Sequence, residues 1–358
     1  MTVAIAAAGT GGHVLPALAV ARELVAGGMD PGEVVFLGGD RFEARAVPAA
    51  GFPFEPFQMV ALRRSLSPRN LGIPLIVRRT ARAMAATLRA RGTRVVLGMG
   101  GYATVPAALA ARRLGLPLFV QEQNAIPGLA IRFAARRARA VFVGLPGPAE
   151  GLPRAMLTGN PLRAELARFE RGDWAAAARG RYGLPEGTLV LGVLGGSLGA
   201  RVLNQAVPVI VDAWRGGPLA VVHLAGAEAS AVAPVAEAAS LPWCCLPFEE
   251  QMQFFYAAAD LVLCRAGAMT ISELAATGTP AILVPLERVG QQHNAAALVA
   301  AGGARLVPQS EVNRLPAVVA NLLGDSAARS EMARSARSAG RPEAAAVIAR
   351  RLREAVDG

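Results

Sequence analysis

Short runs of apolar and β-branched residues alternate with longer amphipathic segments along almost the whole chain. In the first half, the short runs predict strands at Val3–Ala8, Val34–Leu37, Arg94–Leu97, Leu118–Gln121 and Ala140–Val143. Helical patterns follow at about residues 14–27, 41–50, 69–91, 104–114 and 128–137. Strands that alternate with helices in this way predict a parallel sheet with right-handed crossovers.

The same alternation starts again in the second half of the chain. The predicted strands there are Leu189–Leu194, Ala220–Leu224, Trp243–Leu246, Leu261–Leu263 and Ala281–Val284. Turn residues at 146–148 and 159–161 mark the joint between the halves. The pattern predicts an α/β protein with two Rossmann-like domains, residues 1–158 and 159–330, and a tail at 331–358; residues 326–357 read as one or two helices. Ligands of open α/β sheets bind beyond the carboxyl ends of the strands, so two domains facing a central cleft would each hold one substrate.

Length and composition agree with a two-domain globular protein. The chain has 358 residues, of which 53% are hydrophobic and 18% charged, which excludes a disordered chain. Its three cysteines have neither metal-ligand spacing nor the even count of a disulfide framework, so a reducing cytoplasm is expected. No signal peptide and no apolar run of about 20 residues is present, so we expect a soluble or peripheral protein.

The positive charge is concentrated in one stretch. The formal net charge is +11, every basic residue is arginine, and residues 56–149 hold fifteen arginines and one acid, Glu122. Six arginines flank the apolar segment at 71–77: Arg63, Arg64, Arg69, Arg78, Arg79 and Arg82. This pattern favours a surface that meets anionic lipid, and a helix with a solvated arginine face is the alternative. Nucleic acid is disfavoured because no aromatic residue lies between Phe57 and Tyr102.

Three glycine clusters follow predicted strands and open predicted helices. They are Gly9-Thr10-Gly11-Gly12-His13, Gly98-Met99-Gly100-Gly101-Tyr102 and Gly195-Gly196-Ser197-Leu198-Gly199-Ala200. Free amides and the positive helix end favour anions at such turns, so three of them favour diphosphate ligands. None fits GxGxxG, and the absence of lysine excludes a P-loop.

A fourth strand-to-helix segment combines a hydroxyl with a carboxylate. Thr270 is expected in the first helical turn, where it can donate to a phosphate, and Glu273 lies one turn further on the same side. A carboxylate beside a diphosphate suits the vicinal hydroxyls of a ribose. The alternative is a capping box, with Thr270 as the cap and Glu273 as its partner.

Six strings together make the chain resemble the MurG family. They are Gly9 through Ala19, Gly100-Gly101-Tyr102-Ala103-Thr104-Val105-Pro106, Glu122-Gln123-Asn124-Ala125-Ile126-Pro127-Gly128, Gly159-Asn160-Pro161-Leu162-Arg163, Gly195 through Ala200 with Asn204, and Arg265 through Glu273. The family consists of peripheral membrane glycosyltransferases that add N-acetylglucosamine to undecaprenyl-diphosphate-linked muramyl peptide, turning lipid I into lipid II of peptidoglycan. The resemblance covers about residues 2–310.

The resemblance implies a GT-B fold with UDP-N-acetylglucosamine as donor, held mainly by the second half, and no metal or other cofactor. The residues it places at the donor are Thr10, Gly11, Gly12, Asn124, Arg163, Ser197, Phe248, Ala268, Met269, Thr270, Glu273, Gln291 and Gln292. The residues it places at the acceptor are Gly9, Thr10, Gly11, Gly12, His13, Gly100, Gly101 and Tyr102. No DxD metal-binding pattern is present.

An inverting transfer also needs a base for the acceptor hydroxyl. His13 and Glu122 are the candidates. We favour His13 as base or acceptor contact, because the surrounding arginines are expected to lower the pKa of Glu122 and leave it to orient the substrate. Three positions depart from the family: Gln121 replaces a histidine, Leu198 replaces a glutamine, and the loop between Pro285 and Asn294 is short, which leaves the sugar-reading residue open between Gln291 and Gln292.

The resemblance further implies a peripheral protein on the cytoplasmic face of the cell membrane, with no nucleic-acid partner. Two other functions stay open from the sequence. One is another GT-B UDP-sugar transferase with a lipid or small-molecule acceptor, and the other is a nucleotide-sugar-binding module without turnover.

Overall fold

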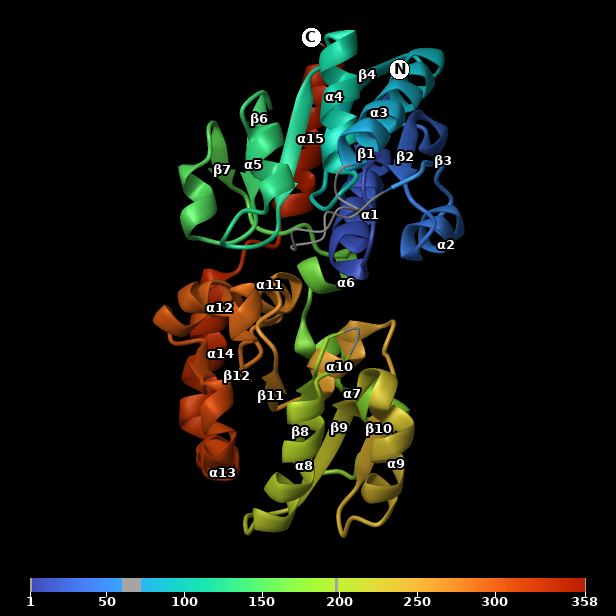
Figure 1. The fold of residues 1–358 in the computed structure, drawn as a ribbon. Helices are drawn as coiled ribbons and strands as arrows, with labels where there is room; N and C mark the ends of the chain where they lie inside the picture. The colour runs from blue at the N-terminus through green and yellow to red at the C-terminus, as the bar shows by residue number, and fades with distance from the viewer. Residues whose placement is uncertain (1, 60–71, 197–198, 358) are drawn as a thin grey trace. The chain divides into compact units, whose positions relative to one another are not determined.

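The chain forms two compact units, and its last helix belongs to the first of them (Figure 1). The structure is a computed structural model that describes residues 2–59, 72–196 and 199–357. The first unit comprises residues 1–163 and 342–358, and the second comprises residues 164–341. The expected boundary after residue 158 lies slightly before this division.

The first unit is built on a seven-stranded parallel sheet with the order β3-β2-β1-β4-β5-β6-β7. Its strands are β1 (Thr2–Ala6), β2 (Val34–Gly38), β3 (Phe54–Pro56), β4 (Thr93–Gly98), β5 (Leu118–Glu122), β6 (Ala140–Val143) and β7 (Ala155–Leu157). In the centre, Ile5 of β1 pairs with Phe36 of β2 on one side and with Leu97 of β4 on the other. This order places the carboxyl ends of β1, β4 and β5 next to one another.

Helices cover both faces of this sheet, which explains why its strands read as unbroken apolar runs. The helices are α1 (Gly11–Ala26), α2 (Phe42–Ala49), α3 (Ile73–Ala90), α4 (Thr104–Leu114), α5 (Leu129–Ala135) and α15 (Ala344–Asp357). One core joins α1, α2 and α15 to one face of the sheet, and Ile348 and Leu352 of α15 are fully buried in it. The other core joins α3, α4 and α5 to the opposite face.

The second unit repeats the architecture with a six-stranded parallel sheet in the order β10-β9-β8-β11-β12-β13. Its strands are β8 (Leu189–Leu194), β9 (Leu219–Leu224), β10 (Trp243–Leu246), β11 (Leu261–Cys264), β12 (Ala281–Leu283) and β13 (Ala304–Leu306). Its helices are α6 (Ala164–Ala167), α7 (Arg171–Tyr182), α8 (Arg201–Ala213), α9 (Ala229–Glu237), α10 (Met252–Ala258), α11 (Ala268–Thr277), α12 (Gln291–Ala300), α13 (Leu315–Gly324) and α14 (Ser326–Ala339).

All ten predicted strands are present, with ends within two residues of those predicted. The structure adds β3, β7 and β13, which are three-residue edge strands too short to give a periodic pattern. Residues 326–357 form two helices, as the pattern indicated. A separate tail at 331–358 was the wrong expectation, because α14 packs in the second unit and α15 in the first. Within the described ranges, no helix is long and apolar enough to cross a membrane.

Candidate functional site

In the first unit, the candidate site lies where β1, β4 and β5 end side by side. We call the loops Gly9–His13, Gly98–Tyr102 and Gln121–Gly128 the first-unit site. The strand order brings all three loops to one edge of the sheet. This is the edge at which parallel α/β sheets bind ligands.

His13 lies in the first turn of α1, because that helix begins at Gly11 rather than at residue 14. Its ring packs against the second glycine turn: a Cβ atom added to Gly100 would lie 3.0 Å from His13 Cδ2 and 3.2 Å from Nε2. Gly100 and Gly101 also have φ angles of +84° and +64°, which favour glycine. The glycines of this turn therefore make room for the imidazole.

The environment of His13 favours its neutral form. Its Nδ1 is buried and has no hydrogen-bond partner among the described residues. Burial lowers the pKa of His13, and the negative charge of Glu43 acts in the opposite direction. A neutral imidazole at pH 7 is the state that a general base requires.

A buried chain of amides supports the loop after β5. Gln121 Nε2 donates to Asn160 Oδ1 at 2.8 Å, Asn160 Nδ2 donates to the carbonyl oxygen of Gln123 at 3.1 Å, and Gln123 Nε2 donates to Gln121 Oε1 and to the carbonyl oxygen of Met99. Gln121 is fully buried, and its hydrogen bonds join the loop after β5 to Asn160. An amide does not titrate, so this position has no side chain that could transfer a proton. Gln123 Oε1 is buried without a partner in the described chain, and it would lie 3.1 Å from a Cβ atom on Gly100.

Glu122 holds the same loop. Its side chain accepts hydrogen bonds from the Asn124 amide (2.9 Å), the Asn124 side chain (3.1 Å) and the Gly128 amide (2.8 Å), and it is 3% exposed. Burial raises the pKa of Glu122, so the expectation that arginines lower it was wrong. The carboxylate orients Asn124, which is exposed, and the start of α5.

The structure adds a residue that sequence reasoning missed. Glu43 of α2 is fully buried and accepts the amide hydrogens of Gly9 and Gly39, each at 3.0 Å. Gly9 was expected at the acceptor diphosphate, but its amide hydrogen is already donated to Glu43. Thr10 and Gly12 are exposed at the start of α1. The pair Gly38-Gly39, which follows a predicted strand like the other glycine turns, was the available signal.

Tyr102 lies over the first glycine turn. Its ring carbon Cε1 would be 3.5 Å from a Cβ atom on Gly9. Burial, followed by the negative charge of Glu43, raises the pKa of Tyr102. The phenol therefore stays protonated at neutral pH and can donate a hydrogen bond to a ligand.

In the second unit, the loops after β8, β10, β11 and β12 carry the expected donor residues. We call these residues (Phe248, Ala268, Met269, Thr270, Glu273, Gln291 and Gln292) the second-unit site; Ser197 and Leu198 lie outside the described residues. Helix α11 has Gly267 as its N-cap, without a capping side chain. The capping-box alternative was therefore wrong, and Thr270 is the third residue of the helix.

Glu273 is partly exposed, and one of its oxygens is already oriented. Tyr256 donates its hydroxyl hydrogen to Glu273 Oε2 at 2.7 Å, and the Tyr256 ring is buried in the core. Phe248, just beyond β10, is 56% exposed. An exposed aromatic ring of this kind can stack against a nucleobase. Carboxylate and aromatic face thus belong to the same edge of the second sheet.

The two glutamines at the start of α12 differ in their contacts. Gln291 Oε1 accepts the Leu286 amide hydrogen at 2.9 Å, so this side chain closes its own loop. Gln292 is exposed. This difference favours Gln292 as the residue that reads a ligand.

A buried polar network holds the start of α8, the helix that follows the third glycine cluster. Asn204 of α8 donates to the Ala225 carbonyl oxygen (3.1 Å) and to Glu228 (2.9 Å), and its Oδ1 lies 3.0 Å from His223 Nε2. His223 is fully buried, and burial lowers its pKa to about 4. Arg201 donates to Glu228 at 2.8 Å. These contacts fix α8 against the neighbouring strand β9.

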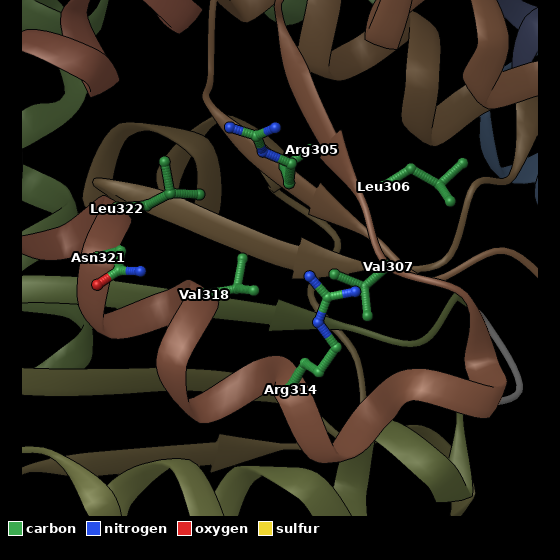
Figure 2. Close-up of a pocket in the computed structure, with 7 residues that line it drawn as sticks. All are labelled: Arg305, Leu306, Val307, Arg314, Val318, Asn321 and Leu322. Atoms are coloured by element: carbon green, nitrogen blue, oxygen red, sulfur yellow. The ribbon is translucent and has the colours of Figure 1, made fainter.

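Among the described residues, these sites hold no cluster of metal ligands, and a pocket of the second unit lies apart from them. In the described ranges, no group of three or more His, Cys, Asp or Glu side chains is placed to hold a metal ion. A pocket of about 220 Å³ is lined by residues of β13 and α13, among them Arg305, Leu306, Val318 and Leu322 (Figure 2). It contains none of the expected site residues, and its Arg314 is paired with Glu311.

Comparison with known proteins gives a consistent result over the whole chain. Residues 3–143 match the glycosyltransferase family 28 N-terminal domain, and residues 190–348 match the C-terminal domain of that family. The chain is 42% identical, over its whole length and 99% of the relative, to the UDP-N-acetylglucosamine–N-acetylmuramyl-(pentapeptide) pyrophosphoryl-undecaprenol N-acetylglucosamine transferase of Halorhodospira halophila. It is 40% identical to the protein of the same name from Acidothermus cellulolyticus, covering 96% of this chain and 95% of that one.

Comparison with solved structures agrees with these sequence matches. The crystal structure of Acinetobacter baumannii MurG matches with a TM-score of 0.75 and 29% identity, covering 99% of both chains. A UDP-GlcNAc 2-epimerase from Neisseria meningitidis matches with a TM-score of 0.69 at 15% identity, which shows a common fold alone.

Proposed function

Because the chain belongs to the MurG family within glycosyltransferase family 28, we propose that it transfers N-acetylglucosamine from UDP-N-acetylglucosamine to undecaprenyl-diphosphate-linked N-acetylmuramyl peptide. The fold is the two-domain GT-B fold, and the enzyme is a hexosyltransferase. The observation that carries the proposal is identity of 40–42% over at least 96% of the chain to relatives that share this activity in their names.

We assign the donor to the second-unit site. Thr270, near the start of α11, would donate to the UDP diphosphate, where the helix dipole also favours negative charge. Glu273, oriented by Tyr256, would accept the ribose hydroxyls, and Phe248 would lie beside the uracil. Arg163 would neutralise the leaving diphosphate, so the proposal assigns no step to a metal.

We assign the acceptor to the first-unit site, with His13 as the base. The 4-hydroxyl oxygen of the muramyl sugar bonds to C1 of N-acetylglucosamine while the bond from C1 to the UDP oxygen breaks. The electron pair of that bond leaves with UDP, and the hydroxyl proton passes to the imidazole. One displacement of this kind inverts the anomeric centre, from the α-linked donor to a β-1,4 product.

The acceptor is a lipid, and the first unit has an exposed apolar and basic helix face beside its site. Leu129, Arg132, Phe133 and Arg136 recur at helical spacing along α5 and are all exposed, Leu129 by 77% and Phe133 by 45%. We call these four residues the α5 stripe. It begins next to Gly128, whose amide Glu122 holds.

The α5 stripe supports a peripheral position on an anionic membrane. Arginine beside apolar side chains is the combination that pairs with lipid headgroups and dips below them. The exposed Leu75, Arg78, Arg79 and Arg82 of α3 agree with the same interpretation. Arg63, Arg64 and Arg69 lie outside the described residues. We propose the cytoplasmic face of the membrane as its position, because a donor from the cytosol can reach the enzyme there.

The direct test is transfer of labelled N-acetylglucosamine from its UDP donor to lipid I. We expect lipid II as product, with UDP-glucose and UDP-N-acetylgalactosamine as poor donors. His13→Ala should lower kcat by about 10²- to 10⁴-fold, the usual contribution of a general base. Absence of product with lipid I would refute the proposed function, and near-normal turnover of His13→Ala would refute the role of His13.

A further inference from the structure

A buried carboxylate lies directly beneath the first-unit site. Glu43 is fully buried, and its two oxygens accept two backbone amide hydrogens, one from Gly9 and one from Gly39. No cationic side chain of the described chain is within ion-pair distance of Glu43. Its negative charge is therefore balanced only by amide dipoles, and its field reaches the neighbouring groups with little screening.

Glycines on β2 and its loop create the space for this carboxylate. A Cβ atom on Gly38 would lie 2.8 Å from Glu43 Cγ, and one on Gly39 would lie 3.0 Å from Glu43 Oε1. The Gly9 amide is the third wall of the pocket, and Gly9 begins the turn that leads into His13. Glu43 thus ties the loop after β2 to the loop after β1.

The charged and titratable groups around His13 come from three elements. Glu43 of α2 acts on His13 and on Tyr102, the tyrosine of the second glycine turn, while Asp40 and Arg41, just before α2, act on Tyr102. From β5 the neighbour is the neutral Gln123. The charged residues Arg350 and Arg353 of α15 lie at the other end of α1, around Gly27 and Gly28. Glu43 is the group whose charge opposes the effect of burial on His13.

We propose that Glu43 is a positioning residue of the transfer reaction, which fixes the first glycine turn and stabilises the imidazolium that forms when His13 takes the acceptor proton. A buried carboxylate at this place does two things that an amide cannot. It accepts both backbone hydrogens, and it lowers the free energy of the protonated base in the transition state. The inference rests on the proposed role of His13.

The test combines histidine NMR with kinetics on the full chain. The protein has three histidines, so the ring signals of His13 can be assigned with His13→Ala and titrated. In Glu43→Gln, which keeps the size and loses the charge, we expect the pKa of His13 to fall by about one unit. The acid limb of the pH profile of kcat/KM should move down by the same amount, and kcat should drop at least tenfold, with the KM for UDP-N-acetylglucosamine unchanged.

Glu55→Gln is the matched control. Glu55 is a carboxylate of the same unit, on β3, and is paired with Arg91. This variant should leave the pKa of His13 and the kinetics as in the wild type. Glu43→Asp, which keeps the charge, should recover most of the lost kcat.

The outcomes separate the two proposals. A lower kcat in Glu43→Gln with an unchanged pKa of His13 would mean that Glu43 is only structural and would overturn the inference. If Glu43→Gln does not fold, judged by thermal unfolding and UDP binding, Glu43→Asp decides. A His13 pKa and a kcat that both stay near the wild-type values support the inference, and a kcat at least tenfold lower with an unchanged His13 pKa overturns it. An acid limb that persists in His13→Ala would refute His13 as base, whatever the NMR titration shows.

Discussion

At the residue scale, the His13 ring can occupy its position because residue 100 is a glycine and has no Cβ atom. Gly100 lies between His13 and the unpaired Oε1 of Gln123, and both would be 3.0–3.1 Å from a Cβ atom there. Such contacts are too short for a tightly packed site to absorb without movement. Glycine is therefore needed at position 100 for two reasons: the His13 side chain occupies the space of a Cβ atom, and the backbone has a positive φ angle.

Gly100→Ala should displace His13 and lower kcat by about tenfold to a hundredfold. The matched control is Gly115→Ala, since Gly115 has φ +68° and nothing within 4 Å of its Cβ position. Both variants should lose about 1 kcal/mol or more of folding stability from backbone strain. Thermal unfolding with single-turnover kinetics checks this, and equal kcat in the two variants would contradict it.

His223 makes the stability of the second unit depend on pH. Burial lowers its pKa from 6.5 to about 4, so below pH 6.5 the unfolded chain binds a proton that the folded unit does not. The stabilisation is complete above pH 6.5 and is lost as the pH falls towards 4, by about 3 kcal/mol in total. His223→Gln should be less stable at pH 7.5, and its disadvantage should shrink with acidification.

Denaturant unfolding between pH 7.5 and 4.5 measures this effect. His293→Gln, a substitution of an exposed histidine, is the control and should follow the wild-type curve. Parallel pH curves for the wild type and His223→Gln would contradict this prediction, because they would show that folding does not change the pKa of His223.

At the scale of elements, we propose that α11 presents a hydroxyl, a helix end and a carboxylate to the same donor. Glu273→Gln should raise the KM for UDP-N-acetylglucosamine by about 10- to 100-fold, because a hydrogen bond to a charged group contributes about 1.5–3 kcal/mol. Tyr256→Phe should raise it only several-fold, since it removes the hydroxyl that orients Glu273. The control Glu237→Gln, on exposed α9, should leave KM unchanged.

The helices and strands were predictable from the sequence, whereas the buried polar contacts that hold the site loops were not. Apolar runs and glycine turns give strands, helices and the edge where loops meet, because these depend on local periodicity. Glu43 and Asn204 are different: each occurs in a helical pattern that says nothing of which backbone group the side chain will reach. For Glu122 the error came from counting arginines along the sequence, whereas burial and amide contacts decide its pKa.

At the scale of the molecule, the two units differ in charge. The first holds 23 arginines and 11 acidic residues, and the second holds 14 and 15. The excess of positive charge therefore belongs to the unit with the proposed acceptor site and the α5 stripe. Exposed apolar side chains of the second unit, such as Val209 and Val235, lie on separate helices, α8 and α9.

The double variant Leu129→Ser/Phe133→Ser should weaken binding to phosphatidylglycerol vesicles at least tenfold, because each apolar side chain buried in lipid contributes about 1.5–3 kcal/mol. Val209→Ser/Val235→Ser is the matched control and should bind as the wild type does. Sedimentation with anionic and neutral vesicles measures both, and UDP binding confirms folding. Equal vesicle binding by the two double variants would refute a membrane role for the α5 stripe.

The return of α15 to the first unit has a consequence for how the protein is made. Ile348 and Leu352, near the end of the chain, complete a core that begins with the first strand. On the ribosome, the first unit must wait for the last helix, while residues 164–341 can already fold. The unit whose synthesis begins first is thus the unit that completes its core last, and a chain that stops before residue 344 would leave the apolar side chains of this core uncovered.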